Sequence, residues 1–63
     1  MDDTKAIQDA YDDVVDQLFK ALFTRCAGAA GDPAIEARAV AAFGEGLVIA
    51  RRVRDSALAV AKA

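Results

Sequence analysis

The sequence predicts an all-α fold, a single helical-hairpin domain over residues 1–63, from three observations. Apolar residues recur at alternating steps of four and three before residue 26, Asp32 and Pro33 form a helix-start signal, and the rest of the chain is rich in alanine. We therefore expect one helix over about residues 4–26 and a second over about residues 33–61, joined by a short turn that contains glycine.

The first expected helix has a long apolar stripe. Steps of four and three keep side chains on one face of an α-helix, because about 3.6 residues complete a turn. The stripe consists of Ile7, Tyr11, Val14, Leu18 and Ala21, and it is widened by Val15 and Leu22. Between residues 18 and 23 apolar side chains surround nearly the whole helix, so we expect that one neighbouring helix cannot cover all of them.

The second expected helix begins at a well-defined boundary. Asp32 at the N-cap can accept hydrogen bonds from free amides, and Pro33 at the first helical position gives up a donor that has no partner there. Two glycines within residues 44–46 cost about 2 kcal/mol in a helix relative to alanine. We still expect one continuous helix, with a bend or break at 44–46 as the alternative.

The reason is a small-residue face that stays in register across the glycines. It consists of Ala39, Ala42, Gly46, Ile49, Val53 and Val60. We expect the bulky side chains of Phe19, Leu22 and Phe23 to pack over this face, because large and small side chains interdigitate well.

Self-association is the expected source of stability. A chain of 63 residues buries only about 60% of its unfolded surface, and one cysteine with no histidine allows neither an internal disulfide nor a typical zinc site. The apolar residues also spread over a wider arc than one helical seam covers. We expect a homodimeric four-helix bundle, with a candidate interface of Ile7, Tyr11, Val14, Leu18, Phe19, Leu22, Phe23, Phe43, Leu47 and Val53.

Charge is distributed unevenly along the chain. Residues 1–17 hold six aspartates and one lysine, a net charge of −5, whereas residues 46–63 hold four basic residues and one aspartate, a net charge of +3. If the chain reverses near residues 28–31, where Gly28 and Gly31 can adopt left-handed conformations, position n lies opposite position 59 − n. We therefore expect Arg51, Arg52 and Arg54 beside residues 3–9.

The residue types favour a binding role and do not suggest an enzyme. Hydroxyl nucleophiles are limited to Thr4, Thr24 and Ser56, and no histidine is present to act as a base. We expect no catalytic residue, cofactor or metal. The leading hypothesis is a small interaction, adaptor or regulatory protein that self-associates and binds a protein partner.

Two alternatives stay open. The first is a nucleic-acid-binding regulator whose phosphate contacts would be Arg38, Arg51, Arg52 and Arg54 across the dimer. Acidic net charge and nearby aspartates make solvated or paired arginines the favoured interpretation. The second alternative is an accessory subunit of a larger complex.

The lone Cys26 is expected to be an inert thiol, with a redox role as the alternative, because a helix C-terminus does not favour a thiolate. A single cysteine also favours a reducing compartment, so we expect a cytoplasmic protein. The longest uncharged stretch is far shorter than the roughly 20 residues that a membrane span needs, so we expect a soluble chain with no membrane partner.

Overall fold

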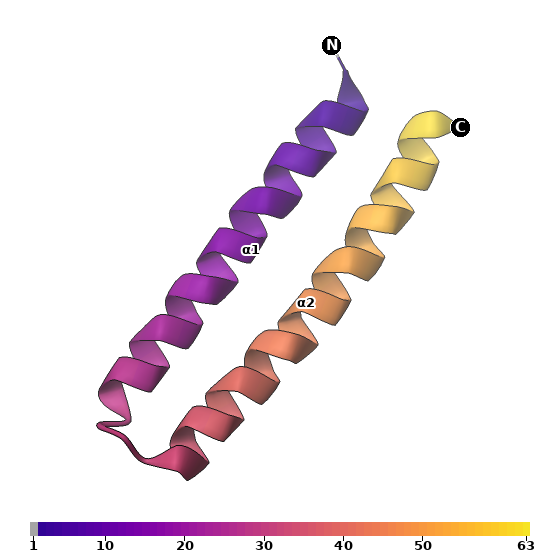
Figure 1. Cartoon of the computed structure of the whole chain (residues 1–63). Coiled ribbons are helices and arrows are strands. Elements are labelled where there is room, and N and C mark those ends of the chain that lie inside the picture. Colours follow the sequence, from indigo (N-terminus) through magenta and orange to yellow (C-terminus); the bar gives the residue numbers. More distant parts are fainter. Residues whose placement is uncertain (1) are drawn as a thin grey trace.

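The computed structural model describes residues 2–63, which form two long helices. Helix α1 runs over Asp3–Gly28 and helix α2 over Pro33–Lys62. The helices lie side by side and antiparallel, and both chain ends lie at the same end of the molecule (Figure 1). The predicted all-α helical hairpin is confirmed, with helix ends within two residues of those expected from the sequence.

Both helices begin at an aspartate cap. The side chain of Asp2 accepts hydrogen bonds from the amides of Thr4 and Lys5, at 3.0 and 3.4 Å. The side chain of Asp32 does the same for Ala34 and Ile35, at 2.9 and 3.4 Å. Each cap satisfies amides that the first helical turn leaves without a partner, which is why the helices start where they do.

The turn between the helices uses two left-handed residues. Ala30 has φ +52° and Gly31 has φ +85°, whereas Gly28 stays in the last turn of α1. The left-handed conformation expected at Gly31 is therefore present, but the second left-handed residue is Ala30 and not Gly28. The amide of Asp32 donates to the carbonyl of Ala29 at 3.0 Å, and this bond closes the turn.

Helix α2 is continuous through residues 44–46, as the small-residue face predicts. Gly46 lies against Leu18 of α1, and a Cβ atom on Gly46 would be 2.8 Å from Cδ2 of Leu18. Leu18 is thus the bulky side chain that lies over the small residues. The expectation that Phe19 and Phe23 do so is wrong, since these rings are 56% and 65% exposed.

The antiparallel register differs from the expected one. Two residues that face each other across the seam have numbers with a nearly constant sum, and the sequence predicts a sum of 59. The observed sum is 64 for Leu18 and Gly46, and 65 for Tyr11 and Arg54. The reversal takes up residues 29–32 together with the first turn of α2, so α2 starts beyond the end of α1. Arg54 therefore lies beside Tyr11 and not beside residues 3–9.

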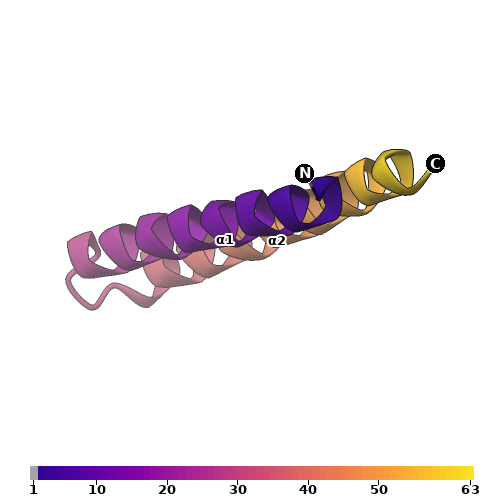
Figure 2. The ribbon, with the colours of Figure 1, turned by 90° about the horizontal axis from the view of Figure 1, so that it is seen from above.

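The hairpin is a single layer of helices without a filled core. Its Cα atoms span 47 × 17 × 7 Å, and Figure 2 shows from above that α1 and α2 follow each other along their whole length. Within residues 2–63, only Ala29 and Ala39 are buried, at 7% and 3% exposure. Every large apolar side chain in this range is therefore at least partly exposed.

Candidate interaction surfaces

The seam between the helices is made of half-buried side chains. On α1 they recur at steps of four and three, and on α2 they alternate between bulky and small residues. The seam residues of α1 are Ile7, Tyr11, Val15, Leu18, Leu22 and Cys26, and those of α2 include Ala42, Phe43, Gly46, Leu47, Ala50, Ala57, Leu58 and Ala61. This seam holds the hairpin together and separates its two faces.

One face carries an apolar groove of about 540 Å³. We call it the groove face and define it by six of its lining residues, which are Ile7, Ala10, Val14, Gly46, Ile49 and Val53. A second hollow of about 470 Å³ continues it toward the chain ends, and Ile7 and Ala57 line both. The small residues at the bottom of the groove leave room for side chains from another molecule.

The opposite face carries exposed aromatic and branched side chains. We call it the phenylalanine face and define it by Phe19, Phe23, Val40 and Val48, all more than half exposed. Phe23 is nine residues from Val14, and Val40 is nine residues from Ile49. Nine residues are about two and a half helical turns, so each pair points to opposite sides of its helix.

The predicted interface residues fall into three groups. Six lie in the seam between α1 and α2, namely Ile7, Tyr11, Leu18, Leu22, Phe43 and Leu47. Val14 and Val53 lie on the groove face, at 44% and 58% exposure. Phe19 and Phe23 lie on the phenylalanine face.

Sequence reasoning left several surface residues out of that interface. Ala10, Gly46 and Ile49 line the groove, and Val40 and Val48 are exposed like Phe19 and Phe23. Gly46 and Ile49 already belonged to the in-register small-residue face, so the spacing of that face was the signal for the groove. Val40 and Val48 do not follow the spacing of that face, because each lies one residue before or after one of its members.

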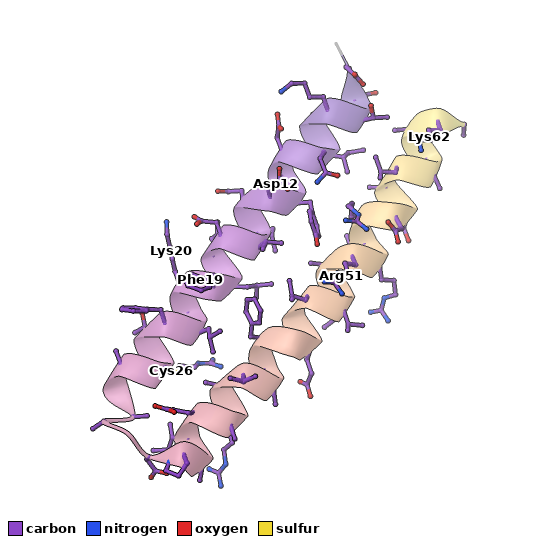
Figure 3. The ribbon with its side chains drawn as sticks, in the orientation of Figure 1. Asp12, Phe19, Lys20, Cys26, Arg51 and Lys62 are labelled. Carbon is purple, nitrogen blue, oxygen red and sulfur yellow. The ribbon has the colours of Figure 1, made fainter. Side chains whose placement is uncertain are left out.

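The four predicted arginines do not form one patch. Arg38, Arg51 and Arg52 are exposed, and Arg51 and Arg52 are adjacent residues, so they point about 100° apart around α2. In Figure 3, Arg51 is drawn over the ribbon of α2 and Phe19 over the ribbon of α1, so neither side chain points into the seam. Arg54 points into the seam instead, where its guanidinium carbon lies 4.5 Å from the centre of the Tyr11 ring.

Ion pairs in the described part of the chain stay within one helix. Lys5 pairs with Asp9 at 2.8 Å, Lys20 with Asp16 at 2.9 Å, and Arg54 with Asp55 at 3.1 Å. The Lys20 ammonium donates a hydrogen bond to the Asp16 carboxylate, and this bond raises the pKa of Lys20 above its usual 10.5. Figure 3 shows Lys20 on the edge of α1 that points away from α2. The opposite charges of the two helices thus do not meet across the seam.

Chemical sites are sparse on this hairpin. Cys26 is a half-buried free thiol near the end of α1. Among residues 2–63, no three acidic or cysteine side chains gather as metal ligands would. Neither α1 nor α2, as described, contains a stretch long and apolar enough to cross a lipid bilayer.

The exposed surface of the hairpin is larger than that of a compact monomer. It amounts to 4619 Å², whereas a compact monomer of 6.6 kDa exposes roughly 3,900 Å². The excess of roughly 700 Å² is close to the roughly 800 Å² that each partner buries in a standard protein interface.

Comparison with models of protein families, with curated proteins and with solved structures found no match to this chain.

Proposed function

We propose that this chain is a non-enzymatic interaction module that works as a homodimeric four-helix bundle and recruits a protein partner. The observation that carries the proposal is the lack of a core: among residues 2–63, no side chain larger than alanine is buried. A single hairpin has only one seam, and a second hairpin supplies the missing neighbours.

Two further observations support self-association. Apolar side chains occupy both faces of the helical layer, and the surface excess of roughly 700 Å² matches one side of a standard interface. Two-fold pairing of identical chains is the commonest closed arrangement for small proteins. Two stacked layers cover one face of each hairpin and leave the other two faces outward, and an outward apolar face suits a protein partner.

Sedimentation over a hundredfold dilution tests the proposal, with helicity followed by circular dichroism at each concentration. We expect a dimer at high concentration and a loss of helix that accompanies dissociation. A monomer that keeps its full helicity at every dilution would refute the dimer.

The proposal also includes a cytoplasmic location and a role in binding. The module works in the cytoplasm, where its lone Cys26 stays reduced. Binding, and not chemistry on a substrate, is its contribution, since no polar or charged residue within 2–63 has the burial that tunes catalytic groups.

A further inference from the structure

We infer that the groove face is the surface on which a second copy of this chain docks, in an arrangement that places Asp13 of each copy beside Arg52 of the other. The inference rests on the proposed homodimer and assigns its interface and symmetry. The phenylalanine face is then the one that stays outward.

The groove face suits a second copy because it is apolar along the whole of α2. Ile35, Ala39, Ala42, Gly46, Ile49 and Val53 continue it at alternating steps of four and three, and Val60 follows two turns later. This is the seam pattern of helices that pack lengthwise against other helices. The opposite face carries the exposed Arg51, which is eleven residues beyond Val40 and therefore in line with it. Arg54 lines the groove, but its guanidinium lies against the Tyr11 ring.

The charges beside the groove select the symmetry. Asp13 precedes Val14 and Arg52 precedes Val53, so each charge is turned by about 100° from the groove toward the outer edge of its helix. Both side chains are exposed. Within residues 2–63, Arg52 has no ion-pair partner, and Asp13 accepts only a long hydrogen bond of 3.4 Å, from Gln17.

A lengthwise two-fold axis brings these charges together. Such an axis lays α1 of one hairpin over α2 of the other, without changing the height of any residue along the hairpin. The numbers 13 and 52 add up to 65, as do those of Tyr11 and Arg54, which are in contact across the seam. Asp13 therefore lies at the height of Arg52 of the second copy, on the same edge of the bundle, twice by symmetry.

A transverse axis gives a different result. It lays α1 over α1 and α2 over α2, so Asp13 and Arg52 end up on different pairs of stacked helices. The two symmetries thus differ in one measurable contact.

The first experiment identifies the face. Val14→Asp places a carboxylate in the groove, and we expect it to raise the dimer dissociation constant at least about tenfold in sedimentation. The matched control is Phe23→Asp on the opposite face, which we expect to change the constant less than about twofold. A dimer that Phe23→Asp dissociates and Val14→Asp leaves intact would overturn the assignment.

The second experiment identifies the symmetry, and it works even if single variants unfold on dissociation. Asp13→Arg and Arg52→Asp are each expected to weaken their own homodimer about tenfold, because each repulsive contact occurs twice. When the two variants are mixed, opposite charges meet again, so we expect a heterodimer about as stable as the original dimer. A mixture no tighter than the separate variants would overturn the lengthwise arrangement.

These outcomes are separable from the proposed homodimer. If the unmodified chain stays monomeric, the proposed function fails with the inference. If it dimerises but the mixture shows no recovery, the lengthwise arrangement fails and the proposed homodimer stands.

Discussion

A side chain of α1 occupies the space that a side chain at position 46 of α2 would need. Cδ1 and Cδ2 of Leu18 lie 3.3 and 2.8 Å from the position of a Cβ atom on Gly46. Around Gly44, two residues earlier on the same helix, no atom lies within 4 Å of such a position. The two glycines therefore have different reasons for being in the helix.

Alanine substitutions should separate these reasons. Gly44→Ala is expected to stabilise the protein by about 1 kcal/mol, because alanine favours helix and meets nothing at this position. Gly46→Ala should lose most of that gain, because Leu18 must move away from the new methyl group. Thermal unfolding at one chain concentration measures both, and adding Leu18→Ala to Gly46→Ala is the control for the contact. Equal gains from both alanines would contradict the close approach.

Left-handed backbone at Ala30 leads to a second prediction. Its φ of +52° costs an alanine about 1 kcal/mol, whereas glycine adopts this conformation freely. Ala30→Gly should therefore raise the unfolding free energy by roughly 0.5 kcal/mol, because the strain that it relieves exceeds the extra entropic cost of ordering a glycine. Gly31→Ala, at φ +85°, should lower it. Chemical denaturation of both variants checks the opposite signs, and two destabilised variants would contradict the assigned turn.

A third prediction concerns the contact between Arg54 and Tyr11. The guanidinium carbon lies 4.5 Å from the ring centre, and only 26% of the arginine side chain is exposed, so a cation–π interaction of about 0.5–1 kcal/mol is expected. Arg54→Met keeps the apolar stem and should lose that amount in thermal or chemical unfolding. Tyr11→Phe keeps the aromatic face and should lose little. Asp55→Ala is the control for the exposed ion pair, and if it costs as much as Arg54→Met, the aromatic contact is not what stabilises Arg54.

The sequence was sufficient to predict where the two helices lie in the chain. It was insufficient to predict which side of α1 faces α2. Asp32 and Pro33 determine where α2 starts, and the small-residue face determines its continuity. The predicted stripe through Val14 and Ala21 drifts off the seam, which passes through Val15 and Leu22 instead. The seam residues Ile7 and Leu18, like Tyr11 and Leu22, are eleven apart, which corresponds to about 3.67 residues per turn. Adjacent apolar residues such as Val14 and Val15 fit either stripe, so only packing decides.

The register and the arginines could not be predicted for a related reason. The register of α2 against α1 depends on how many residues the chain uses to reverse its direction. The sequence of the loop and of the first turn of α2 does not indicate that number. When the sum of the numbers of two facing residues is 65 and not 59, Arg54 faces Tyr11 and not the acidic start of α1. The same register places Arg52 at the height of Asp13, so it also creates the charge relationship on which the inferred dimer depends.

The cap at the start of α1 makes stability depend on acidity. The hydroxyl of Thr4 donates to the Asp2 carboxylate at 2.6 Å, and with the amides of Lys5 and Thr4 it lowers the pKa of Asp2 below its usual 3.8. Because the folded pKa is the lower one, the stability that Asp2 contributes is complete above 3.8 and is lost as the pH falls through the folded pKa. Asp2→Asn keeps an acceptor but has no charge to titrate, so it should melt below the unmodified chain at neutral pH, and the gap should close in acid. Melting curves of both chains from about pH 2 to pH 7, at one concentration, measure this difference in melting temperature. The other aspartates titrate in both chains, so their contribution is removed when the two chains are compared. A gap that stays constant over this range would mean that the charge of Asp2 does not stabilise the cap.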